Sequence, residues 1–110
     1  HSNNPAVRAA VLERKEPQTV AWARTRKDAG RGFGFTGGHD HWNWGNRSFR
    51  TLVLNAIVWT AHGKVPEGGV PSKELTVTDL MANQDYEVPG NFNPARIQAM
   101  LDEWAAADKK

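Results

Sequence analysis

The stretch from Gly32 to Asn46, GFGFTGGHDHWNWGN, constrains the fold more than any other part of the chain. Glycine and phenylalanine alternate at its start, which predicts a short strand with one bulky face and one bare face. Gly37 and Gly38 free the backbone from the usual φ/ψ limits and end that strand. A turn dense in His, Asp, Trp and Asn follows. In α/β folds the loop after a strand commonly binds ligands, so we expect the chemistry here.

The sequence before this stretch predicts a helix and the first half of a β-hairpin. Asn4-Pro5 is typical of a helix start and predicts a short helix to about Arg14. The alternating segment 19–26 predicts a strand, and the turn residues 27–30 join it to the strand 31–36. Trp22 is expected to share one face of this hairpin with Phe33 and Phe35 as cross-strand aromatics. The opposite face would then carry only Ala and Gly.

Two further helices are predicted after the hairpin. Asn46 is expected to cap a helix from Arg47 to about Ala61, with Gly63 as its C′ residue. Asn93-Pro94 predicts a last helix to about Ala107. Residues at helical spacing in the first of these helices should face the hairpin: Phe49, Leu52, Val53, Ala56 and Ile57. Ile97, Met100, Leu101 and Trp104 form the apolar face of the last helix.

Segment 52–59 is apolar on nearly every side, which is typical of a helix buried on more than one face. A hairpin covers only one face, so Leu54, Val58 and Trp59 are expected to lack cover within the hairpin and helix. Three remedies are physically open: an absent amino-terminal half of the domain, a second copy, or a tail that folds back. The chain starts at His1 without Met, which we interpret as a partial chain. We therefore expect self-association through the Leu54/Val58/Trp59 face or a hairpin edge.

Composition excludes several classes of function. The 110 residues include 14 Lys+Arg and 12 Asp+Glu, and this net charge of +2 is too balanced to predict nucleic-acid binding. The sequence contains no Cys, which excludes disulfides, thiolate metal sites and cysteine nucleophiles. No apolar run approaches the roughly 20 residues that cross a bilayer, so no membrane contact is expected. Hydrophobic residues make up 39% of the chain and charged residues 24%, which are the proportions of a globular protein.

The histidines of the turn suggest a metal site or acid–base chemistry. His39 and His41 flank Asp40, and two imidazoles with a carboxylate suit Zn²⁺ or another divalent ion. His39 is also a candidate general acid or base, because imidazole titrates near neutral pH. The pattern is short, and the alternative is that one histidine bonds to the loop and the other is exposed.

The tryptophans of the turn suggest a carbohydrate ligand. Trp42 and Trp44 would stack on a sugar ring while Asp40 and Asn43 bond to its hydroxyls. The alternative is that at least one of the two indoles closes the core beneath the loop.

The chain also resembles a known family. Three features appear in order: the strand Val20-Ala21-Trp22, the strand ending in Gly38-His39, and the helix with Phe49-Arg50 and Leu54-Asn55-Ala56-Ile57-x-Trp59. Together they resemble the carboxyl-terminal part of a ThuA-like (trehalose-utilisation) domain. That family is similar to class I glutamine amidotransferases and has a flavodoxin-like α/β sandwich.

The resemblance implies a domain boundary and a function. Residues 1–66 would be the carboxyl-terminal part of the domain, and residues 67–110 a linker and helical tail. The implied fold is α/β: helix, hairpin, helix, then an extended tail with a final helix. The implied role is carbohydrate utilisation, on trehalose or a related glycoside, with His39 and Asp40 as catalytic residues. The alternative is a non-catalytic module in which Trp42 and Trp44 hold a sugar or a protein partner. The absence of Cys argues against amidotransferase chemistry.

Overall fold

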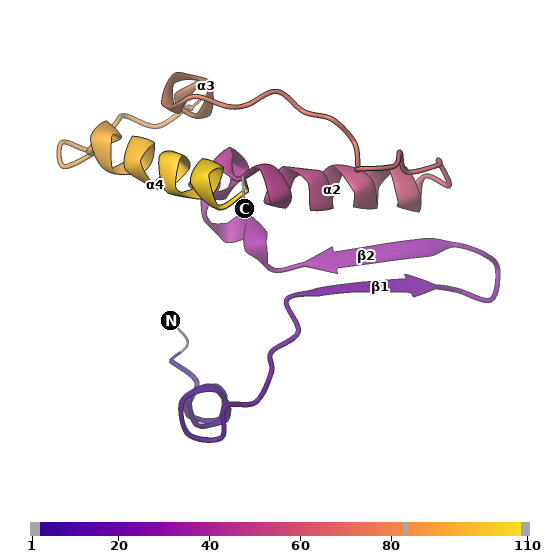
Figure 1. Ribbon diagram of the computed structural model, residues 1–110. Helices are drawn as coiled ribbons and strands as arrows, with labels where there is room; N and C mark the ends of the chain where they lie inside the picture. The colour runs from indigo at the N-terminus through magenta and orange to yellow at the C-terminus, as the bar shows by residue number, and fades with distance from the viewer. Residues whose placement is uncertain (1–2, 83, 109–110) are drawn as a thin grey trace.

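The computed structural model describes residues 3–82 and 84–108. It combines helices with one two-stranded antiparallel sheet, as expected of a small α/β fragment. Helix α2 (Arg47–Thr60) lies along one face of the hairpin, and α3 (Val77–Met81) and α4 (Pro94–Ala107) gather at one end of it (Figure 1). The first helix stands apart, on the other side of the hairpin. None of the helices in the described ranges is long and apolar enough to cross a bilayer.

Side-chain caps start the helices at the predicted residues. The Oδ1 atom of Asn4 accepts a hydrogen bond from the Ala6 amide at 2.9 Å, and α1 (Pro5–Arg8) continues as the π-helix η1 (Ala9–Glu13). Asn46 accepts from the Phe49 amide at 2.9 Å and begins α2. Asn93 accepts from the Ala95 amide at 3.0 Å and begins α4. Each of the three asparagines therefore satisfies amide groups that the first helical turn leaves unpaired.

The predicted hairpin is confirmed, but its register separates Trp22 from the two phenylalanines. Strand β1 (Ala21–Thr25) pairs with β2 (Arg31–Phe35), and Trp22 lies opposite Gly34. The prediction that Trp22 shares a face with the two phenylalanines is therefore wrong, because neighbouring residues of a strand point to opposite faces. The indole covers Gly34 so closely that a Cβ atom there would lie 2.2 Å from the ring.

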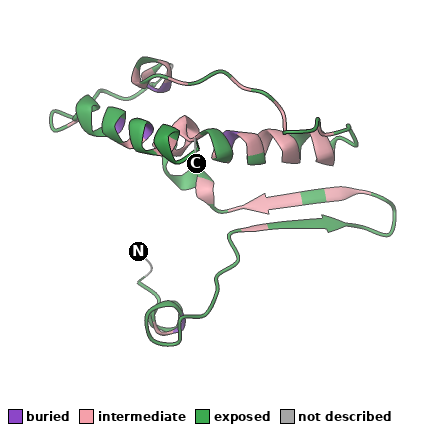
Figure 2. Cartoon of the chain, viewed as in Figure 1, coloured by how far each residue is buried: buried purple, intermediate pink, exposed green. Residues whose placement is uncertain are grey.

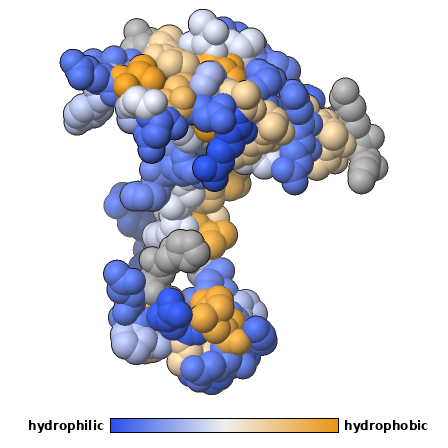
Figure 3. All heavy atoms as spheres, turned by 90° about the vertical axis from the view of Figure 1, so that its left-hand side faces the viewer, coloured by the Kyte–Doolittle hydropathy of each residue, from blue (hydrophilic) through white to orange (hydrophobic). Residues whose placement is uncertain are grey.

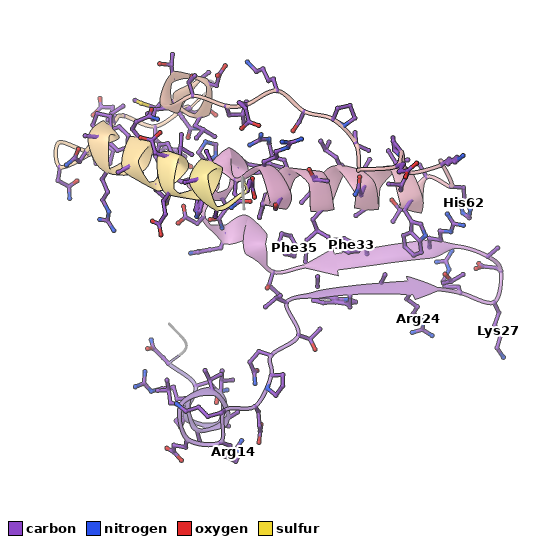
Figure 4. All side chains as sticks on the ribbon, in the orientation of Figure 1. Arg14, Arg24, Lys27, Phe33, Phe35 and His62 are labelled. Atoms are coloured by element: carbon purple, nitrogen blue, oxygen red, sulfur yellow. The ribbon has the colours of Figure 1, made fainter. Side chains whose placement is uncertain are left out.

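The phenylalanine face of the hairpin packs against α2. Phe33 and Phe35 point toward the helix while Arg24 points away from it (Figure 4). The Phe35 and Phe49 rings lie 5.2 Å apart. At the other end, Arg31 donates to the Trp59 carbonyl at 2.9 Å, and its guanidinium lies 5.1 Å from the Trp59 ring centre. The predicted contact between hairpin and helix is confirmed.

The burial of α2 departs from the prediction on two sides. Ile57 is 57% exposed and Leu52 38% exposed, so neither is buried against the sheet as expected. In contrast, Leu54, Val58 and Trp59, expected to lack cover, are half-buried. Arg31 of the hairpin covers the Trp59 ring, and Gly63, just after the helix, lies against Val58. The segment that follows then returns along the helix. There, the Val70 amide donates to Asn55 at 2.8 Å, and Gly69 lies against Thr51.

Helix α2 ends in a Schellman motif, with a different residue at C′ from the one predicted. His62, not Gly63, takes the left-handed conformation, with φ of 62°. Its amide donates to the Trp59 carbonyl at 3.0 Å, and the Gly63 amide donates to the Val58 carbonyl at 2.8 Å. Gly63 is at C″, where a Cβ atom would lie 2.8 Å from the Val58 side chain.

The tail builds the small core. Figure 2 shows the buried residues of the main body where α3, α4 and the start of α2 meet. Leu80, Ile97 and Leu101 are buried there, as the apolar face predicted for the last helix requires. Gly45 fits between two of them, because a Cβ atom on it would lie 2.1 Å from Leu101 and 3.2 Å from Leu80. Residues on either side of position 66 thus share one core.

Candidate functional site

The predicted turn folds as two short 3₁₀ helices, η2 (Gly37–His39) and η3 (His41–Gly45). Asp40 separates them and caps η3, with its Oδ1 atom accepting from the Trp42 amide at 3.2 Å. The Asn43 side chain donates to the Gly37 carbonyl at 2.9 Å and ties the two turns together. The Asn43 amide is therefore already bonded within the loop, whereas the Asp40 carboxylate is exposed.

The two histidines occupy different surroundings. The His39 side chain is exposed and makes no hydrogen bond to the residues that the structure describes. The Nε2 atom of His41 lies 2.6 Å from the Leu80 carbonyl oxygen, so this nitrogen carries a proton and donates it. The Gln84 side chain lies 3.1 Å from the same atom. His41 thus links η3 to α3.

Residues 3–82 and 84–108 bring together no group of three or more His, Cys, Asp or Glu side chains that would hold a metal ion. His41 offers only its Nδ1 atom, because Nε2 is already a donor. A zinc ion normally takes at least three protein ligands. The described part of the chain does not supply that set at His39 and His41.

The two tryptophans of the turn also separate. Trp44 packs edge-on against Phe49, with ring centres 5.1 Å apart, and so extends the contact between hairpin and α2. Trp42 points to the tail, where it stacks on Phe92 with ring centres 5.4 Å apart and ring planes 22° apart. Trp42 is therefore the predicted aromatic ligand-binding residue that remains beside an open surface.

A groove with a volume of about 700 Å³ runs between η3 and α4, beside the Trp42–Phe92 stack. Asp40 and Trp42 line it from the turn, whereas His39, Asn43 and Trp44 do not. The charged and amide side chains on its other wall come from the tail: Asn91, Asn93, Arg96 and Glu103. The floor is apolar, formed by Ile97 and Met100. The groove thus combines an aromatic platform with both signs of charge.

Arg50 holds the turn in place. Among the residues that the structure describes, it is the charged residue that is buried, with 5% exposure. Its Nη1 atom donates to the carbonyls of Trp44 and Gly45 at 2.8 and 3.0 Å. From the same guanidinium, Nη2 donates to the Lys73 carbonyl at 3.0 Å and Nε to the Ser72 hydroxyl at 3.1 Å. The planar fork of arginine suits such spread acceptors. Sequence reasoning assigned Arg50 no structural role.

Comparison with known proteins gives no family: no family model, no curated protein and no solved structure matches this chain. The class of protein is therefore defined by the fold and the groove alone.

Proposed function

We propose that this protein binds a carbohydrate in the groove between η3 and α4. The observation that carries the proposal is the Trp42–Phe92 stack at the edge of a groove lined by Asp40, Arg96 and Glu103. The C–H face of a sugar packs on an indole, while its hydroxyls both donate and accept hydrogen bonds. The exposed carboxylates of the groove can accept hydrogen bonds from sugar hydroxyls, and its guanidinium can donate hydrogen bonds to them. This lining therefore suits both roles of a hydroxyl group.

Binding is favoured over turnover by the position of His39. Of the predicted catalytic pair, Asp40 lines the groove and His39 does not. A general acid or base must reach the reacting group directly or through one water. The role in utilisation of trehalose or a related glycoside, with His39 acting in catalysis, remains a prediction of the family resemblance. The finer fold assignment, the carboxyl-terminal portion of a flavodoxin-like sandwich, also remains a prediction of that resemblance. The order of hairpin, Gly-His turn and helix supports it.

The test is an NMR titration of the chain with trehalose, maltose, cellobiose and glucose. The chain has five Trp residues, so the indole N–H signals form a small, assignable set. We expect a binding sugar to shift the Trp42 signal and leave the Trp22 signal unchanged. Trp42→Ala should abolish binding, and Trp22→Ala is the matched control, because this indole is 51% exposed on the far face of the hairpin.

Two surface variants guard against a folding defect in Trp42→Ala. Asp40→Asn and Glu103→Gln change exposed groove carboxylates, and each should weaken binding without altering the amide spectrum of the core. Binding that survives Trp42→Ala, or a panel in which no sugar shifts the Trp42 signal, would refute the proposal. Turnover of a glycoside that His39→Ala abolishes would favour the catalytic alternative instead.

A further inference from the structure

The N-terminal arm, defined here as α1 and η1 together (Pro5–Glu13), buries Ala10 but leaves its larger apolar side chains exposed. It makes no substantial packing contact with any other helix or strand that the structure describes. Val7, Val11 and Leu12 are 39%, 38% and 55% exposed. Figure 3 shows the arm as a separate lobe below the body, with hydrophobic residues gathered on its surface. The arm therefore offers an apolar surface that its own chain leaves unpartnered.

The outer face of the hairpin, opposite α2, is a second unpartnered surface. Trp22 lies on it and is 51% exposed. Gly32 lies on the same face, and a Cβ atom built there would meet no atom within 4 Å. An exposed indole beside bare backbone is a surface on which aliphatic side chains can pack. Both strands of the hairpin are also sheet edges.

The exposed area of the chain matches what a dimer needs. A compact protein of this mass exposes about 6,100 Å², whereas this chain exposes 8872 Å². Its radius of gyration is 17.2 Å, against about 13 Å for a compact domain of this length. The excess is about 2,800 Å² per chain, and obligate dimers bury about 1,000–2,500 Å² per subunit. The surplus is large enough to form such an interface.

We propose that two copies of this chain form a dimer by exchanging their N-terminal arms, each arm packing on the outer hairpin face of the other copy. A second copy is the favoured occupant because one chain carries both surfaces, and a two-fold axis then covers all four of them. The exposed connector 14–20 gives each arm the reach to cross to the other copy. The net charge of +2 is too small to keep two copies apart.

Sedimentation equilibrium tests the dimer with a matched pair of variants. We expect the unmodified chain to be dimeric at micromolar concentration. Leu12→Asp puts a charge on the arm at a position 55% exposed, and Val88→Asp does the same at 57% exposure on a distant loop. Leu12→Asp should weaken the dimer at least about tenfold, because two copies of the residue lose their apolar contact, whereas Val88→Asp should leave it unchanged. Circular dichroism checks that both variants keep their helices.

The exchange of arms needs a separate readout. The chain has no native Cys, so Arg8→Cys places a single nitroxide label on the arm without removing an apolar side chain. Labelled chains are mixed with ¹⁵N-labelled unmodified chains. We expect the Trp22 indole signal of the ¹⁵N chains to broaden and the Trp42 signal to stay sharp. A label at Val88→Cys, on the distant loop, should leave both signals sharp. A monomeric unmodified chain, equal weakening by Leu12→Asp and Val88→Asp, or a sharp Trp22 signal would each overturn the proposal.

Discussion

Arg50→Met should cost more stability than any exposed substitution in α2. The change removes four hydrogen bonds from the guanidinium, three of them to backbone carbonyls of two segments far apart in the sequence. Methionine keeps the apolar stem, so the loss is mainly polar. The remaining partners are the Trp44, Gly45 and Lys73 carbonyls and the Ser72 hydroxyl.

The magnitude follows from the opposing terms at this site. A hydrogen bond to a charged group contributes about 1.5–3 kcal/mol, so the simple sum for four is about 6–12 kcal/mol. Burying the guanidinium costs several kcal/mol, which offsets part of that sum. Glu74 lies 3.6 Å from the guanidinium, but it is mostly exposed, so solvent screens it. We expect Arg50→Met to lower the free energy of unfolding by about 3–5 kcal/mol.

The assay is urea denaturation followed by tryptophan fluorescence, at one fixed protein concentration because a dimer makes stability concentration-dependent. Arg50→Lys keeps the charge but not the planar fork, and should lose about 1.5–3 kcal/mol. Arg47→Met, an exposed arginine of the same helix, is the control and should change stability by less than about 0.5 kcal/mol. An Arg50→Met variant as stable as that control would refute the reasoning, and full rescue by lysine would assign the effect to charge alone.

Two further predictions concern stability. His62→Gly should raise the free energy of unfolding by about 0.5–1 kcal/mol in urea denaturation, because His62 has a φ of 62° and glycine adopts that conformation without strain; His62→Ala should bring no gain, and an equal gain would contradict the explanation. Asp79 accepts from Lys73 at 2.6 Å and from Thr76, and these bonds hold the pKa of its carboxyl well below the ordinary 3.8. Since the folded-state pKa is the lower one, this contribution is complete above about pH 4 and is lost as the pH falls through the folded pKa. Asp79→Asn should therefore flatten the acid limb of a stability–pH curve, and an unchanged limb would argue against it.

The sequence predicted those parts of the fold that local chemistry determines. The caps at Asn4, Asn46 and Asn93 act within three residues of themselves, and the hairpin needs only a turn between two alternating segments. Helix α3 carried a readable local signal too, the capping box formed by Thr76 and Asp79, which our prediction did not use.

The hairpin register was harder to predict because it depends on the turn. Ala29, not the following glycine, takes the positive φ, at 65°, and sets which residues pair. A shift of one residue exchanges the two faces of a strand, so one turn residue decided where Trp22 points. The C′ residue of α2 was also misassigned. From the sequence alone, either His62 or Gly63 is compatible with the C′ position of a Schellman motif.

The site was only partly predictable because its other half lies about fifty residues away. The turn supplied Asp40 and Trp42, and both line the groove. Phe92, Arg96 and Glu103 come from the tail, and no spacing in the sequence relates them to the turn. Arg50 had no signal either, because an arginine in a helix is usually exposed, and its partners are backbone atoms.

The groove depends on how the tail is tied to the turn, and three separate contacts make that tie. His41 bonds to the Leu80 carbonyl, Gly45 admits the Leu80 and Leu101 side chains, and Arg50 bridges the Gly45 carbonyl to Lys73. His41 is the first residue of η3 and Gly45 is the last. The three contacts therefore hold η3 at both of its ends. The hairpin, by comparison, meets this turn through Phe35 and the Asn43–Gly37 bond. The wall that carries Arg96 and Glu103 is thus built by the tail. The hairpin leaves its outer face, and the arm before it, free for the proposed association.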